Sequence, residues 1–270
     1  MSDSVTDSAA ERVAQNSVFE RFARAGYVTS GLVHLIIGYI AIRLALGGGG
    51  AADQSGALAE LASKPGGVLA LWVATVAFAA MALWRLAETI FGRSTDPKDQ
   101  DPMSEVFDRG KALALAVVYL AFAYSTLEFT RGRGKSTGQQ DAGISAHMMQ
   151  SAAGTVALVA AGLVIVAVGG YHVYKGASQN FLEDLHGAPS NVVRTLGIAG
   201  YVAKGLVLAE VGVLVVVAAI VSDPNRATGL DGALKSLLSQ PFGPVLVVVA
   251  GLGLITYGLY SFAMARYTKM

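Results

Sequence analysis

One stretch constrains the fold of this chain more than any other. Between Arg24 and Arg43 lie eighteen residues that are apolar or small apart from a few polar side chains. An α-helix rises about 1.5 Å per residue, so this run is close to the length that crosses the roughly 30 Å hydrocarbon core of a bilayer. Similar runs begin near Arg109 and near Gly200, and each is followed by a second apolar run. The sequence therefore predicts an all-α, polytopic integral membrane protein with six transmembrane helices.

The composition narrows the classes of function. With 53% hydrophobic and 14% charged residues, the chain is too apolar for a typical soluble domain. The absence of cysteine excludes disulfides, thiolate metal sites and cysteine catalysis. A net charge of +1 gives no reason to expect nucleic-acid binding. No phosphate-binding loop, nucleophile elbow or metal-binding motif occurs, so we expect no cofactor, no metal site and no enzymatic activity.

A self-similarity with a period of roughly 85–90 residues divides the chain into three tandem units. The segment Ala25-Gly26-Tyr27-Val28 recurs as Ala199-Gly200-Tyr201-Val202. Between the two apolar runs of each unit lies a short amphipathic segment, typical of a helix at the membrane surface. Its first glycine and the glycine eleven residues later recur in all three copies, as Gly56 and Gly67, Gly143 and Gly154, and Gly232 and Gly243. Each unit is therefore predicted to be helix, interfacial helix, helix.

These patterns predict boundaries and an orientation. We expect a flexible cytoplasmic tail over residues 1–22, which lacks the features of a signal peptide. Three two-helix repeats should follow at 23–92, 107–176 and 196–270, joined by polar linkers at 93–106 and 177–195. Lys and Arg are more frequent in the tail and these linkers than in the opposite loops, which favours cytoplasmic termini by the positive-inside rule.

Small residues recur seven positions apart in the predicted membrane helices, and a spacing of seven is close to two helical turns. Each pair therefore lies on one face of its helix. Membrane helices associate through close backbone approach at small residues, and glycine abundance alone would not place them so regularly. We predict helix packing at Gly31, Gly38, Gly162, Gly169, Gly205, Gly212, Gly251 and Gly258.

Two motifs carry a resemblance to a known family. The first is the R-x-G-Y-x-x-x-G start at Arg24, Gly26, Tyr27 and Gly31. The second is G-A-L-x-x-L-x-x-x-P-x-G, which includes Gly56, Pro65 and Gly67 in the first copy and Gly232, Pro241 and Gly243 in the third. The pattern resembles bacterial membrane proteins defined by the domain of unknown function 1206. The middle copy departs from it, with Lys111 in place of the glycine and Ala152 in place of the proline. The resemblance implies three tandem two-helix units in the inner (plasma) membrane of a bacterium, and it implies no activity.

Glu210 is the outlier among the intramembrane residues, because it falls near the centre of the fifth predicted helix. A carboxylate at this depth is costly and suggests function by default. The alternative is a protonated Glu210 that hydrogen-bonds to Thr256 or Tyr257 for structural reasons. His34 should differ from it in depth by only about 3 Å, so the two could exchange protons if their helices are neighbours. A simply packed histidine is the other interpretation.

The sequence supports two functions of different classes. The favoured one is a non-enzymatic scaffold or accessory subunit that binds membrane lipid, other membrane proteins or a second copy of itself. The alternative is a small carrier or channel for protons, ions or lipid-like molecules that uses Glu210. An enzyme acting on lipid ranks last, because the chain shows no convergent acid–base set.

Overall fold

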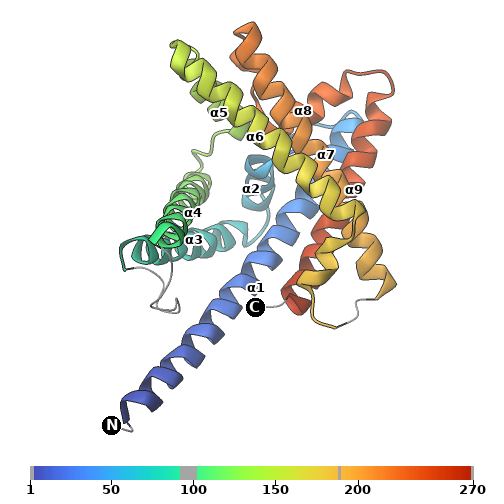
Figure 1. The fold of residues 1–270 in the computed structure, drawn as a ribbon. Helices are drawn as coiled ribbons and strands as arrows, with labels where there is room; N and C mark the ends of the chain where they lie inside the picture. Colours follow the sequence, from blue (N-terminus) through green and yellow to red (C-terminus); the bar gives the residue numbers. More distant parts are fainter. Residues whose placement is uncertain (1–2, 92–101, 188–189, 269–270) are drawn as a thin grey trace. The chain divides into compact units, whose positions relative to one another are not determined.

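The computed structural model describes residues 3–91, 102–187 and 190–268, and all regular elements in these ranges are helices (Figure 1). Six of them are long and apolar enough to cross a membrane, which confirms the predicted fold class. These are α1 (Asp3–Ala45), α3 (Gly67–Phe91), α4 (Pro102–Thr130), α6 (Ala152–Ala177), α7 (Asn191–Val221) and α9 (Gly243–Tyr267). A short helix joins the two membrane helices of each repeat: α2 (Gln54–Ala62), α5 (Thr137–Met148) and α8 (Gly229–Leu238). Two 3₁₀ turns are η1 (Asn180–Asp184) and η2 (Pro224–Arg226).

Several boundaries differ from the sequence-based expectation. Residues 3–22, expected as a flexible tail, are helical and continuous with the first membrane helix. They contain no Gly or Pro, the two residues least compatible with the interior of a helix. Helix α7 begins at Asn191, where Ser190 caps it by accepting a hydrogen bond from Val193 N. Of the predicted linker 93–106, residues 93–101 lie outside the described part of the chain, and the rest belongs to α4.

The chain forms two compact units: residues 1–13 with 58–135, and residues 14–57 with 136–270. The first contains α3 packed against α4. Thr75, buried on α3, lies 2.9 Å from Thr126 on α4, measured between the hydroxyl oxygens. Small side chains are also buried on these helices: Ala82, Ala116 and Ala123. Small residues and the Thr75–Thr126 hydrogen bond thus contribute to holding this pair together.

In the second unit, glycines meet glycines across two helix pairs. On α1, a methyl group added to Gly38 would lie 2.5 Å from the carbonyl oxygen of Gly251 on α9. Such a group on Gly251 would lie 2.8 Å from the carbonyl oxygen of Gly38, so the contact is reciprocal. The same mutual approach occurs at three more pairs: Gly31 with Gly258, Gly162 with Gly212, and Gly169 with Gly205. All eight glycines singled out by their spacing therefore lie where two backbones touch.

The helix pairs do not follow the repeat boundaries. The second membrane helix of one repeat packs against the first membrane helix of another, as α3 with α4, α6 with α7, and α9 with α1. Helix α7 also packs against α9 within the third repeat, where Gly200 allows the Tyr257 backbone to approach. Three of these four helix pairs therefore combine two different repeats.

Glycine is also required where each short helix leads into the next membrane helix. A Cβ at the first or third residue of these membrane helices would overlap a carbonyl of the preceding short helix, at Gly67, Gly154 and Gly243. Just before two of these glycines the chain adopts positive φ, at Gly66 and at Phe242. The recurring P-x-G motif therefore forms a sharp turn that only a residue without a side chain can close.

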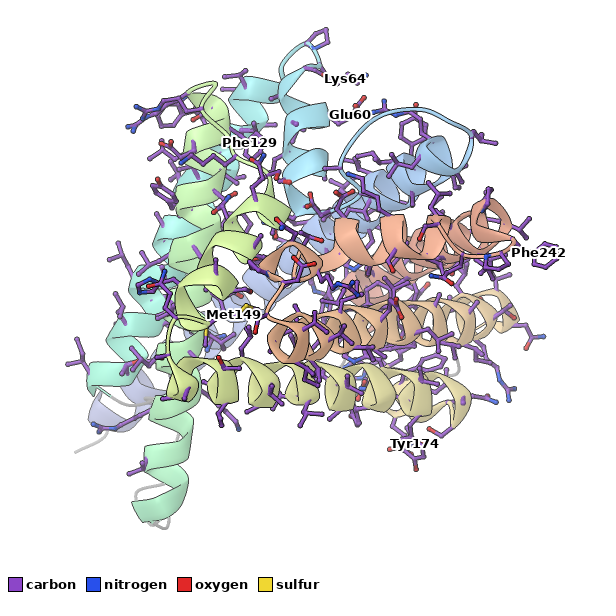
Figure 2. All side chains as sticks on the ribbon, turned by 90° about the horizontal axis from the view of Figure 1, so that it is seen from above. Glu60, Lys64, Phe129, Met149, Tyr174 and Phe242 are labelled. Carbon is purple, nitrogen blue, oxygen red and sulfur yellow. The ribbon has the colours of Figure 1, made fainter. Side chains whose placement is uncertain are left out.

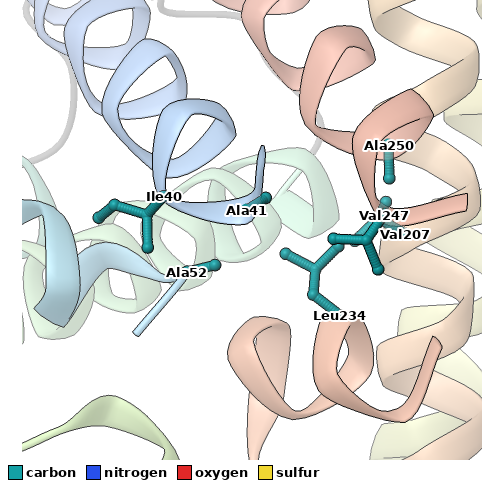
Figure 3. Close-up of a cluster of buried hydrophobic side chains, with 7 residues drawn as sticks. All are labelled: Ile40, Ala41, Ala52, Val207, Leu234, Val247 and Ala250. Atoms are coloured by element: carbon teal, nitrogen blue, oxygen red, sulfur yellow. The ribbon is translucent and has the colours of Figure 1, made fainter. Parts of the chain in front are cut away.

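The buried hydrophobic residues of the second unit form several clusters. Ile40 and Ala41 of α1, Ala52, Val207 of α7, Leu234 of α8, and Val247 and Ala250 of α9 form one buried cluster (Figure 3). In contrast, Tyr174 near the end of α6 and Phe242 before α9 are exposed and project from the helices (Figure 2). Aromatic side chains at helix ends are typical of the membrane–water interface.

Candidate functional site

A lysine lies inside the helix bundle of the second unit. Lys204 is on α7, thirteen residues after the helix begins. Its Nζ donates a hydrogen bond of 2.9 Å to the hydroxyl of Tyr257 on α9 and lies 4.1 Å from the centroid of that ring. An ionisable side chain within the membrane is costly and marks a functional site by default. Tyr257 supplies a hydrogen-bond acceptor and a π face, but no compensating full charge.

His34 of α1 packs against the same tyrosine. Its ring centroid lies 4.7 Å from that of Tyr257, with the two rings tilted by 56°. Its Nδ1 lies 2.7 Å from the carbonyl oxygen of Ser30. A carbonyl can only accept, so Nδ1 is the protonated nitrogen, and in the neutral ring Nε2 remains an acceptor. Three helices thus bring three groups that bind protons to one place: Lys204, Tyr257 and His34.

The depth of this cluster follows from helix length. His34 lies ten residues after Arg24, and Tyr257 lies ten residues before Tyr267, the two cytoplasmic-side ends of α1 and α9 in the predicted orientation. Ten residues correspond to about 15 Å, which is half of the roughly 30 Å hydrocarbon core. The cluster is therefore near the middle of the membrane.

Aromatic rings border the cluster. Tyr201 lies one turn before Lys204 on α7, and its ring centroid is 5.4 Å from that of Tyr257 and 5.6 Å from that of Tyr260. The Phe181 ring of η1 covers Tyr201 at 5.5 Å. The hydroxyl of Tyr260 is buried and has no hydrogen-bond partner among the described residues. These rings separate the lysine from one end of the bundle.

The structure brings together some of the predicted polar residues and leaves others apart. His34 and Tyr257 are in contact. Thr256 donates a hydrogen bond to the carbonyl oxygen of Gly253 on its own helix. Glu210 is half-buried on α7, and its side chain forms no hydrogen bond within the described residues. It lies six residues beyond Lys204, about 9 Å along the helix.

Sequence analysis did not single out Lys204. It follows Gly200 by only four residues, so it falls close to the start of the helix that was predicted to begin at Gly200, near the membrane surface. Two facts of the structure place it deeper: α7 starts at Asn191, and the side chain is held by Tyr257. A basic residue on the same predicted helix as Glu210 was the signal available in the sequence.

The remaining motif residues have structural surroundings. Arg24 donates hydrogen bonds to the carbonyl oxygens of Ala265 and Arg266, at 3.0 and 3.3 Å. It thereby satisfies carbonyls at the end of α9 that have no partner within that helix. Tyr27 packs against the cluster of aromatic rings around Tyr201. Gly26 has open space where a Cβ would lie, so close approach does not explain it.

Fold and site together define a multi-pass α-helical membrane protein with three tandem two-helix repeats and a polar cluster at mid-membrane. The family model named Domain of Unknown Function (DUF1206) matches residues 25–92, 110–179 and 199–268, and the chain belongs to this family. It is 28% identical over 258 residues to an uncharacterised protein, YxxB, of Bacillus subtilis (strain 168), an alignment that covers 93% of this chain and 92% of that protein. No solved structure matches the chain significantly.

Proposed function

We propose that this protein is a non-enzymatic carrier or channel for protons or other small ions, with Lys204, Tyr257 and His34 as its intramembrane site. The observation that carries the proposal is the 2.9 Å hydrogen bond from Lys204 Nζ to Tyr257 at mid-membrane depth. A charged ammonium that is bound to a neutral phenol in hydrocarbon is poorly compensated, and a neutral amine there is a proton acceptor. Such a lysine responds to a proton or an anion more readily than one paired with a carboxylate.

The three groups are suited to passing a proton. Tyr257 both accepts from Lys204 and carries its own hydroxyl proton, and the His34 ring lies against it. Because the three side chains come from three helices, a small change in helix packing would alter their contacts together. Glu210, further along α7, belongs to the alternative route that the sequence suggested.

A scaffold or accessory subunit is the second candidate. The reciprocal glycine contacts between α1 and α9 and between α6 and α7 favour it, because they hold helices of different repeats at backbone contact. A rigid frame of this kind suits a protein that binds lipid, another membrane protein or a second copy of itself. For either candidate we propose the bacterial inner membrane, with both termini in the cytoplasm.

Proton flux into vesicles tests the choice between them. The full chain is reconstituted in vesicles that contain a pH-sensitive dye, with and without a membrane potential. We expect wild-type protein to conduct protons and Lys204→Met to lose at least about tenfold of that flux, since the proton-binding amine is removed. Tyr257→Phe should reduce it too, because the hydrogen-bonded hydroxyl is lost.

Lys235→Met is the matched control, because Lys235 lies on the surface helix α8 and pairs with Asp231 at 2.6 Å. It should conduct like the wild type. If Lys204→Met conducts protons as well as wild type while Glu210→Gln does not, the proton-binding site is Glu210 and not Lys204. If vesicles with wild-type protein show no more proton flux than empty vesicles, with or without a membrane potential, the scaffold is the supported function.

A further inference from the structure

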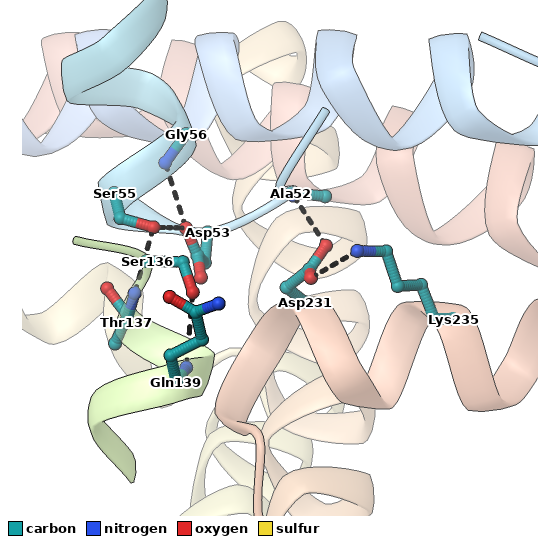
Figure 4. Close-up of polar contacts among 9 residues, drawn as sticks. All are labelled: Ala52, Asp53, Ser55, Gly56, Ser136, Thr137, Gln139, Asp231 and Lys235. Carbon is teal, nitrogen blue, oxygen red and sulfur yellow. Dashed lines mark hydrogen bonds and ion pairs between the residues drawn. The ribbon is translucent and has the colours of Figure 1, made fainter. Parts of the chain in front are cut away.

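The short helices α2 and α5 come from different repeats and meet at their N-termini (Figure 4). The backbone N–H of Thr137, at the start of α5, donates to Ser55 Oγ at 3.0 Å. The Ser55 hydroxyl in turn donates to Asp53 Oδ1 at 2.5 Å. One hydrogen bond thus joins the start of α2 to the start of α5, and Asp53 orients the Ser55 hydroxyl that accepts it.

Helix α8 of the third repeat joins the same place. The Asp141 carboxylate of α5 lies against Gly229, the first residue of α8, 2.6 Å from where a Cβ would be. Asp231 of α8 accepts a hydrogen bond of 2.8 Å from the backbone N–H of Ala52, just before α2. Three carboxylates therefore meet at this junction: Asp53 just before α2, Asp141 on α5 and Asp231 on α8.

One of the two carboxylate oxygens of Asp53, Oδ2, has no hydrogen-bond partner among the described residues. The residue is only 3% exposed. Oδ1 accepts from Ser55 Oγ and from Gly56 N, which caps α2. Oδ2 is buried and has no hydrogen-bond partner among the described residues. A buried carboxylate oxygen without a partner is costly, so this atom indicates a ligand that completes the site.

Asp141 is the neighbouring residue that can supply a hydrogen-bond donor for Asp53 Oδ2. It lies one helical turn after Thr137, on the face of α5 that contacts Ser55. Burial and, secondly, the negative charge of Asp53 raise the pKa of Asp141 to about 6. Two neighbouring carboxylates that repel each other favour a state in which one of them is protonated.

We infer that Asp53 and Asp141 form a shared proton-binding site, in which protonated Asp141 donates to Asp53 Oδ2 and joins α2 to α5. One proton is taken from water and forms an O–H bond on Asp141. Loss of that proton leaves two negative charges at the junction and weakens the contact between the first two repeats. The site lies outside the membrane-spanning helices and is independent of the proposed transport function.

Other charged groups near the junction are paired or exposed. On α8, Lys235 pairs with Asp231, and on η2, Arg226 pairs with Asp223 at 3.3 Å. On α1, Arg43 lies beside Gly48 and Gly50 in the loop that leads to α2. His147 is exposed in the last turn of α5, the helix that carries Asp141.

The pH dependence of stability has a definite sign. A carboxyl whose pKa is higher in the folded than in the unfolded protein binds protons more strongly when folded. Its stabilisation is therefore present at low pH and is lost as the pH rises through the interval from the ordinary value of 3.8 to about 6. For the full chain in detergent, we expect the unfolding temperature to fall by about 5 °C between about pH 4.5 and about pH 7.5.

Asp141→Asn should remove this decline, because the amide donates to Asp53 Oδ2 at every pH. Asp53→Asn keeps the cap of α2 but removes the charge that opposes ionisation of Asp141, so the decline should move to lower pH. His147→Asn is the matched control and should keep the wild-type decline. An infrared carbonyl band of a protonated carboxyl should appear in wild type near pH 6 and be absent in Asp141→Asn.

Three results would overturn the inference. One is a wild-type decline that persists in Asp141→Asn or disappears in His147→Asn. The second is a wild-type infrared spectrum without the titrating carbonyl band. This result would rule out the protonated carboxyl even if the variants fail to fold. The third is stabilisation of wild type, but not of Asp53→Asn, by millimolar Ca²⁺ or Mg²⁺ at neutral pH, which would make a metal ion the ligand.

Discussion

Thr126 on α4 and Thr75 on α3 are joined by a hydrogen bond between their hydroxyl groups, and both side chains are buried. Hydrogen bonds between membrane helices contribute only about 0.6 kcal/mol on average. We expect Thr126→Val, which has nearly the same shape, to lower the free energy of unfolding by about that amount. Chemical unfolding in detergent of the full chain measures it.

Thr130 provides the control for this substitution. It lies one turn further along α4, and its hydroxyl donates back to the carbonyl oxygen of Leu127 on its own helix. Thr130→Val should leave the free energy of unfolding within about 0.3 kcal/mol of wild type. If both valine variants lose the same amount, the Thr75–Thr126 contact contributes nothing specific.

At the level of single residues, sequence analysis found Tyr257 and His34 but not the lysine that links to them. Lys204 could not be recognised because its depth depends on where α7 begins, and helix ends are poorly determined by pattern alone. Sequence analysis did not identify the carboxylates at the junction of the short helices, for another reason. Asp53, Asp141 and Asp231 stand three, two and one residues before the repeated glycine of their copies, so alignment of the repeats does not superimpose them.

At the level of helices, Gly169 and Gly170 offer a direct test of backbone contact. A Cβ at Gly169 would lie 2.6 Å from Ala209 N and 2.7 Å from the carbonyl oxygen of Gly205, both on α7. Gly169→Leu should therefore force α6 and α7 apart and lower the free energy of unfolding by roughly 1–3 kcal/mol. The unfolding temperature in detergent, or retention of the monodisperse peak after heating, reports the loss.

Gly170 is the matched control, because it is adjacent on the same helix and has nothing within 4 Å of an added Cβ. Gly170→Leu makes the same chemical change on the exposed face of α6. Its stability should stay within about 0.5 kcal/mol of wild type or rise slightly, since leucine is the better helix former. A loss equal to that of Gly169→Leu would mean that bulk, and not helix contact, decides the outcome.

The spacing of seven predicted which helix faces carry glycine, but it did not predict their partners. A periodic pattern fixes the face of one helix only and does not say which helix that face will contact. The structure pairs Gly38 of the first repeat with Gly251 of the third, and Gly162 of the second with Gly212 of the third. Partner choice depends on where the short helices and linkers direct the chain, which pattern analysis does not capture.

For the molecule as a whole, the six membrane helices and the three repeats were predictable, because they depend on long apolar runs and on a recurring motif. The family matches follow the repeats closely, at 25–92, 110–179 and 199–268. What the repeats do not convey is how their short helices are joined. The hydrogen bond from Thr137 N to Ser55 and that from Ala52 N to Asp231 connect all three copies at one end of the second unit.

That end should face outward if the positive-inside rule holds, and two single cysteines can test it. The chain has no cysteine of its own, so each introduced thiol is unique. Asn225 follows the end of α7, His186 precedes its start, and both are exposed. An impermeant thiol reagent applied to intact cells should label Asn225→Cys and not His186→Cys, while permeabilised cells should label both. The reverse pattern in intact cells would place the short helices in the cytoplasm. It would also expose the Asp53–Asp141 pair to cytoplasmic pH, which would change the compartment whose acidity the junction senses.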